Sequence, residues 1–161
     1  MCILYINTLY TNKFCTCALL KYTLIFNSSV FLLGVLVIAD VYFILQALKS
    51  KVFTILVAIA GIGALGVGLF TEDLLLLHAA FTVITFAFAG ISAIASYKVG
   101  KPPFSYISAV LGTITLIALP LMVTGNDLGL GIGGMERLIA YPSLLWIMGF
   151  GAHLMGHQND K

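Results

Sequence analysis

Charged side chains are scarce in this sequence. They make up 9% of its 161 residues, whereas 61% of the residues are hydrophobic and the mean hydropathy is +1.11. A soluble domain carries about 25% charged residues, so this chain has too few polar side chains to cover a soluble globular fold. Intrinsic disorder is excluded for the same reason, because it requires low hydrophobicity. The composition therefore predicts a polytopic membrane protein.

Basic residues and cysteines are few as well. Eight Lys and Arg against six Asp and Glu give a net charge of +2, and no basic helix face is visible, so we expect no nucleic-acid partner. The three cysteines are Cys2, Cys15 and Cys17. An odd number so close together is not a disulfide framework, and Cys15 and Cys17 lack a second pair of metal ligands.

The chain has only three histidines. His153 and His157 have the i, i+4 spacing that can ligate a metal. However, no Glu follows His153, and His157 lies in the polar tail. A haem between two helices needs paired histidines at one depth, whereas His78 is expected near the outer face and His153 near the inner face. We therefore expect no metal site and no cofactor.

Long apolar runs are what the sequence does have. A bilayer core about 30 Å thick needs about 20 apolar residues per helix, and five stretches reach that length. They cover residues 27–48, 52–70, 74–97, 104–124 and 138–155. Charges, Gly or Pro interrupt them, as is typical of interface loops. Because most connections are short, the sequence predicts an all-α, up-and-down transmembrane bundle of five spans.

The predicted bundle occupies residues 22–157 without a domain boundary. Residues 1–21 are interrupted by polar side chains, so we expect an external or interfacial arm rather than a signal peptide. Residues 158–161 are expected to form a solvated tail.

The distribution of basic residues predicts the orientation of the bundle in the cell membrane. Five lysines fall on one side of the predicted bundle: Lys49, Lys51, Lys98, Lys101 and Lys161. Three basic residues fall on the other: Lys13, Lys21 and Arg137. This excess places the C-terminus in the cytoplasm and the N-terminus outside.

Small residues at helical spacing predict close helix packing. Lipid tails are as apolar as Leu, so membrane helices associate through close backbone approach and interhelical hydrogen bonds. The second span carries Ala60, Gly61, Gly63, Ala64, Gly66 and Gly68. The fifth span carries Gly149, Ala152 and Gly156.

Asp40 lies near the middle of the first span. A carboxylate there costs about 2.5–3.5 kcal/mol, and the surrounding apolar side chains offset this cost. Such residues usually face the bundle interior and mark function, although a neutral Asp can also be hydrogen-bonded for packing. We expect partners at similar depth on the third span, namely Ser92, Ser96 and Tyr97.

Further ionisable residues gather toward the predicted outer side. His78 lies five residues after Asp73, about 7 Å below the outer loop. It could be a general base, a metal or haem ligand, or a buried hydrogen-bonding residue. Asp73 and Glu72 also suit the positive end of a helix, with Thr71 as its N-cap.

The loop before the fifth span contains Gly129-x-Gly131-x-x-Gly134. No strand precedes it, so the dinucleotide-binding interpretation is excluded. We interpret it as a flexible glycine turn that delivers Glu136 and Arg137 to the outer mouth of the fifth span. Arg137 could pair with an acidic neighbour, bind a lipid phosphate, or be an ordinary interfacial anchor. Trp146 suits an interfacial aromatic belt.

Three motifs carry a family resemblance. The first is Ile25-Phe26-Asn27-Ser28-Ser29 followed by Gly34, and the second is Gly68-Leu69-Phe70 followed by His78. The third is Gly134-x-Glu136-Arg137-Leu138-Ile139-Ala140-Tyr141-Pro142, continuing through Leu145-Trp146 to Gly149, Gly151 and Gly156. Their order and spacing over about residues 5–157 resemble the "domain of unknown function 998" family of small polytopic membrane proteins.

The resemblance implies no established activity, but it points to particular residues. These are Asn27, His78, Glu136 and Arg137. The family typically has six helices, so the resemblance also implies that the first is missing here. Membrane lipids, a second copy of the chain or a partner helix would then fill the groove that it leaves.

Three functions fit these observations. A non-enzymatic scaffold, accessory subunit or lipid-binding bundle is favoured by the scarcity of ionisable groups, with Asn27, Asp40 and Arg137 as binding residues. A membrane-embedded enzyme acting on lipid or isoprenoid head groups at the outer leaflet would use His78 as base, Glu136 or Asp73 as acid or metal ligand, and Arg137 to hold a phosphate. A transporter or proton relay through Asp40 is less favoured, because no internal repeat is evident.

Overall fold

A computed structural model describes residues 12–48, 50–70 and 74–158 of the chain, with side chains described for residues 23–48, 50–70 and 74–156. These residues contain five α-helices, one short 3₁₀ helix and no strand. The elements are α1 (Asn12–Leu48), α2 (Lys51–Leu69), α3 (Leu75–Ala95), η2 (Ser96–Lys98), α4 (Phe104–Val123) and α5 (Ile132–Gln158). The predicted all-α fold is confirmed.

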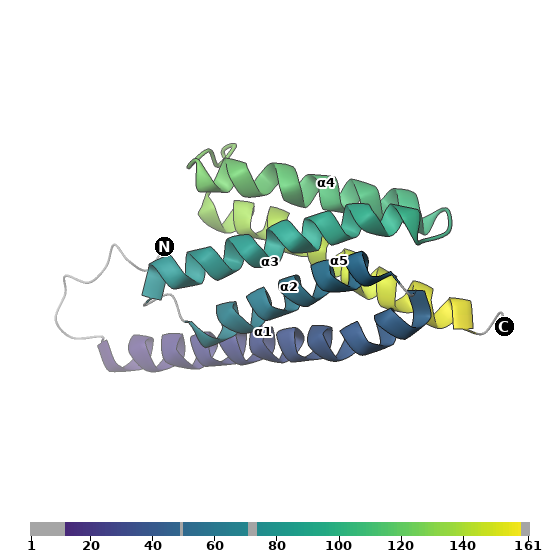
Figure 1. The fold of residues 1–161 in the computed structure, drawn as a ribbon. Helices are drawn as coiled ribbons and strands as arrows, with labels where there is room; N and C mark the ends of the chain where they lie inside the picture. The colour runs from purple at the N-terminus through teal and green to yellow at the C-terminus, as the bar shows by residue number, and fades with distance from the viewer. Residues whose placement is uncertain (1–11, 49, 71–73, 159–161) are drawn as a thin grey trace.

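The helices pack as neighbours in chain order (Figure 1). α1 contacts α2, α2 contacts α3, α3 contacts α4, and α4 contacts α5, with a smaller contact between α3 and α5. α1 and α5 are therefore the two edge helices. Both views show α5 crossing the bundle obliquely, so that it begins beside α4 and ends nearer to α1.

The bundle has two ends, which we name after their histidines. The His78 end holds the start of α3, the loop between α4 and α5, and the start of α5. The His153 end holds the turn between α1 and α2, the turn between α3 and α4, and the last turns of α5.

All five helices contain a segment long and apolar enough to cross a membrane. These segments are Thr23–Leu48, Lys51–Leu69, Leu75–Lys98, Phe104–Val123 and Ile132–Gly156. Large apolar side chains also cover the outside of the bundle, as at Leu76, which is 84% exposed. Such a surface matches hydrocarbon rather than water. The five predicted spans thus correspond to the five observed helices.

Two helices begin earlier than the apolar runs predict. α1 begins at Asn12, so residues 12–21, expected to form an arm, belong to the same helix as the first span. α5 begins at Ile132, and the prediction that a flexible glycine turn carries Glu136 and Arg137 is wrong, because both residues lie on α5. The turn itself ends at Gly131, which has a φ of 70°.

The glycines of α2 let two neighbouring helices approach closely. A Cβ at Gly68 would lie 2.6 Å from the backbone nitrogen of Phe31 on α1, and a Cβ at Gly63 would lie 2.6 Å from Thr85 Oγ1 on α3. Gly61 likewise faces α1. The tight packing predicted for the second span is confirmed, and α2 uses its small residues on two sides.

The small residues of the fifth span behave differently. A Cβ at Gly149 would lie 2.9 Å from the ring of Phe104 on α4, so this glycine is at a helix contact. A Cβ at Gly156 would meet no atom within 4 Å, and Ala152 is exposed. Only the first of these three residues therefore packs as predicted.

Candidate functional site

Hydroxyl groups join α4 to α5 in the bundle interior. Thr115 Oγ1 lies 3.2 Å from Ser143 Oγ and 3.4 Å from the carbonyl oxygen of Ile139. Ser143 donates to the same carbonyl at 3.1 Å. Thr115 and Ser143 are both buried, so this cluster satisfies polar groups within the bundle and fixes the contact between the two helices.

Trp146 and two serines form a second internal group. The Trp146 Nε1–H donates to Ser96 Oγ at 3.2 Å, and Ser96 donates to the carbonyl of Ala93. Ser92 donates to the carbonyl of Phe88 at 2.7 Å. Trp146 is only 2% exposed, so it is a core residue and not a member of an interfacial belt. The serines expected to be partners of Asp40 have these partners instead.

His153 has a structural position at its end of the bundle. Its Nε2 accepts a hydrogen bond from the backbone N–H of Lys101 at 3.3 Å, and its ring stacks on Phe104 with a centroid distance of 5.0 Å. These contacts tie α5 to the turn between α3 and α4. With Nε2 accepting, the ring proton lies on Nδ1.

His78 lies at the opposite end, as expected, so the two histidines cannot share one iron. Its Nδ1 is 2.8 Å from the carbonyl oxygen of Phe70, at the end of α2. Because a carbonyl oxygen only accepts, Nδ1 carries a proton, and in the neutral imidazole Nε2 is then the acceptor. The half-buried ring therefore satisfies a carbonyl that the end of α2 would otherwise leave without a partner.

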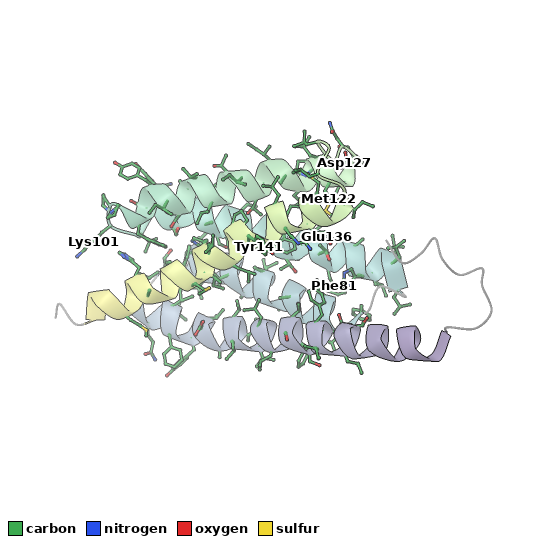
Figure 2. The ribbon with its side chains drawn as sticks, turned by 180° about the vertical axis from the view of Figure 1, so that it is seen from behind. Phe81, Lys101, Met122, Asp127, Glu136 and Tyr141 are labelled. Atoms are coloured by element: carbon green, nitrogen blue, oxygen red, sulfur yellow. The ribbon has the colours of Figure 1, made fainter. Side chains whose placement is uncertain are left out.

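Glu136 and Arg137 lie near the start of α5, and their side chains are exposed. Figure 2 shows Glu136 and Asp127 toward the His78 end and Lys101 at the other. Asn27 is 9% exposed on α1, near the start of its apolar segment at the same end. Asp73 is outside the described residues. The candidate site residues with described positions, other than Asp40, therefore share one end of the bundle.

One groove lies between α1 and α5, and a second hollow, of about 510 Å³, lies among α2, α3 and α4. The groove between α1 and α5 has a volume of about 430 Å³. α1 contributes Asp40, Phe43 and Ala47, and α5 contributes Ile147, Gly151 and Leu154. Val57 of α2 closes it from the interior, together with Trp146 and Phe150. We call this the α1–α5 groove.

Among the described residues that line the α1–α5 groove, Asp40 is the only charged one. It precedes Leu48, the last residue of α1, by eight residues, which places it about 12 Å from that helix end. Its side chain is exposed. The groove therefore presents one carboxyl group among apolar side chains, within the apolar segment of α1.

The α5 wall of this groove was not among the predicted site residues. Gly151 is exposed on an apolar helix, and a Cβ there would meet no atom within 4 Å. The only signal in the sequence was this glycine, which resembled any other small residue of a membrane helix. His78, Glu136 and Arg137 do not line the groove.

Comparison with known proteins gives one match. The family model described as "Protein of unknown function (DUF998)" matches residues 17–153. Neither the curated proteins nor the solved structures contain a match to this chain.

Proposed function

The chain belongs to the DUF998 family of proteins of unknown function, and we propose that it acts by binding rather than by catalysis. It is a scaffold, accessory subunit or lipid-binding bundle of the cell membrane, and the α1–α5 groove is its binding surface. The observation that carries this proposal is the groove itself, with Asp40 in its wall.

The lining of the groove supports a binding role. Binding sites are typically concave and mostly apolar, with a few polar groups that fix the orientation of the bound molecule. The α1–α5 groove has this composition, since aromatic and aliphatic side chains surround one carboxyl group. It also lies between the two edge helices, where the bundle has no further helix of its own in the described residues.

His78 and His153 support the same proposal, because both are used in helix contacts. His78 binds the carbonyl at the end of α2, and His153 binds the backbone of Lys101. The hydroxyls of Ser92 and Thr115 are likewise bonded to helix carbonyls, whereas the buried Thr82 Oγ1 has no partner in the described part of the chain. The bonded polar side chains thus contribute to the packing of the bundle.

We also propose that the His153 end faces the cytoplasm. Lys51, Lys98 and Lys101 lie at this end, whereas Arg137 lies near the other. An excess of Lys and Arg in short loops is typical of the cytoplasmic side. Labelling of a Lys101→Cys variant by an impermeant thiol reagent tests this orientation, with the native cysteines replaced by serine. The label should react only when the cytoplasmic face is accessible.

Native mass spectrometry of the detergent-purified protein tests the binding role. Wild type is compared with Gly151→Leu, which fills the groove, and with Gly156→Leu on the same helix. Neither glycine has an atom within 4 Å of an added Cβ, and Gly156 does not line the groove. Wild type and Gly156→Leu should retain a bound lipid or polypeptide that Gly151→Leu loses. Equal retention in all three proteins, or no retained mass, would contradict the proposal.

A second candidate is an enzyme acting on lipid or isoprenoid head groups. The observation in its favour is that His78, Glu136 and Arg137 share one end of the bundle and that His78 Nε2 remains an acceptor. Release of phosphate from a polyprenyl phosphate in vesicles, lost in both His78→Gln and Glu136→Gln, would establish it. A transporter or proton relay through Asp40 has no comparable support, since Asp40 lines an edge groove.

A further inference from the structure

The position of Asp40 restricts what can occupy the α1–α5 groove. An aspartate at the centre of a membrane helix costs about 2.5–3.5 kcal/mol, and such residues pair with one another, with basic side chains or with backbone carbonyls. Asp40 is about 12 Å from the end of α1, and its short side chain cannot reach the interface. An occupant that brings a hydrogen-bond donor to this depth would satisfy the carboxylate of Asp40.

A lipid does not provide such a donor. At this depth a phospholipid presents methylene groups, which carry no charge and donate no hydrogen bond. A lipid would fill the apolar part of the groove around Phe43 and Leu154. It would leave the Asp40 carboxyl without a partner, at the cost of an unsatisfied polar group in hydrocarbon.

Among the residues whose side chains the structure describes, a second copy of this chain does not provide a matching cation either. Lys51 and Lys98 lie at the ends of their apolar segments. Arg137 is five residues from the start of α5, about 8 Å along the helix axis, but it lies near the His78 end. Asp40 is closer to the His153 end. Two copies with the same orientation therefore do not bring these groups to one depth.

We propose that the α1–α5 groove receives a transmembrane helix of another polypeptide, with a Lys or Arg side chain placed against Asp40. This inference rests on the proposed function, because it names the occupant of the same groove. The charges are complementary, and a cation beside Asp40 satisfies the carboxyl group within the membrane.

The size and walls of the groove fit side chains of such a helix. A helix with its side chains is about 10–12 Å across, so a groove of about 430 Å³ admits the side chains of one helix face. Ala47 and Gly151 on the two walls are small, and small residues allow helix backbones to approach closely. The groove thus offers a charge partner and room for contact.

The test uses the full chain and synthetic transmembrane peptides in phosphatidylcholine vesicles. The peptides have about 20 residues of Leu and Ala and differ at one position, which is Lys in one and Leu in the other. This position is placed about 12 Å from one end, to match Asp40. Association is measured by energy transfer between fluorophores on the chain and on the peptide.

The Lys peptide should bind wild type about three- to tenfold more tightly than the Leu peptide, the range measured for polar contacts between membrane helices. Asp40→Asn, which keeps the shape of the side chain, and Asp40→Leu, which favours insertion, should both abolish the difference. Gly151→Leu should weaken the binding of both peptides, whereas Gly156→Leu should weaken the binding of neither.

Three outcomes overturn the inference. Both peptides could bind wild type equally, with Gly151→Leu weakening the binding of both. The groove would then be a docking surface that does not select a cation, so only the inference would fail. If Gly151→Leu changes the binding of neither peptide, both the inference and the proposed function fail. If copies of the chain associate with one another and Asp40→Asn abolishes this, the occupant is a second copy.

Discussion

The two edge helices are attached to the bundle in different ways. The α1–α2 contact is made by glycines, since Gly61 and Gly68 let the side chains and backbone of α1 approach α2. The α4–α5 contact also has a glycine at Gly149, but it adds the hydroxyls of Thr115 and Ser143. One contact therefore depends on the close fit of backbones, and the other depends partly on hydrogen bonds between side chains.

The two walls of the groove also differ in where their polar groups lie. On α5 the polar side chains of the inward face are bonded to α4 or to η2, as Ser143 and Trp146 show. On α1 the contact with α2 is apolar, with Val37 and Ile44 buried against it. Asp40 lies outside this contact and lines the groove. The α1–α5 groove thus combines an apolar α5 wall with a carboxyl group on α1.

The largest expected effect is at the α1–α2 contact. Gly68→Ala places a Cβ 2.6 Å from the backbone nitrogen of Phe31, and backbone cannot rotate away. We expect the free energy of unfolding in detergent to fall by about 1–3 kcal/mol. Thermal unfolding followed by circular dichroism measures this loss.

Gly133→Ala is the matched control, because a Cβ at Gly133 meets no atom within 4 Å. An alanine in a helix is favoured over glycine by about 0.5–1 kcal/mol, so this variant should be equally or more stable than wild type. Equal stability of Gly68→Ala and Gly133→Ala would contradict the close approach of α1 to α2 at Gly68.

A smaller effect is expected at the α4–α5 contact. Thr115→Val removes the hydroxyl and keeps the shape of the side chain, and Ser143→Ala removes its partner. A hydrogen bond between membrane helices contributes about 0.6 kcal/mol, and at most about 1.7 kcal/mol. A double-mutant cycle on stability should therefore give a coupling energy of this size. Strictly additive losses would show that these hydroxyls do not act on each other.

An effect of similar size is expected at the bond between Ser96 and Trp146. The chain has one tryptophan, so its fluorescence reports this site alone. Ser96→Ala removes the acceptor of the indole N–H, and the emission maximum should change while stability falls by about 1 kcal/mol. Ser29 is an exposed residue of α1, so Ser29→Ala should leave the emission of Trp146 unchanged. The same shift in both variants would contradict this assignment.

The sequence predicted the parts of the fold that depend on composition and on consecutive helices. Apolar runs between charged or glycine-rich breaks gave the five helices, and short connections made successive helices neighbours. The small residues of the second span predicted its close contacts. However, spacing alone did not show that Gly68 faces α1 and Gly63 faces α3, because the whole helix is apolar and hydropathy marks no inward face.

The α1–α5 groove depends on helices that are far apart in sequence, and no local pattern predicted it. The sequence identified Asp40 as a functional candidate, but it suggested partners on α3, whose serines are bonded elsewhere. It also suggested an interfacial position for Trp146, which is buried beside the groove. α5 crosses the bundle obliquely, so that Trp146 and the following turns of α5 form the groove wall opposite Asp40.

Fluorescence quenching of Trp146 tests most directly whether the α1–α5 groove is open to molecules from the bilayer. The full chain is placed in vesicles whose phospholipids carry bromine on acyl carbons at the depth of Asp40. Because Trp146 lines the groove, an acyl chain that enters should quench its emission in wild type and in Gly156→Leu, and Gly151→Leu should abolish most of the quenching. Equal quenching in all three proteins, or none in wild type, would contradict an accessible groove between the two edge helices.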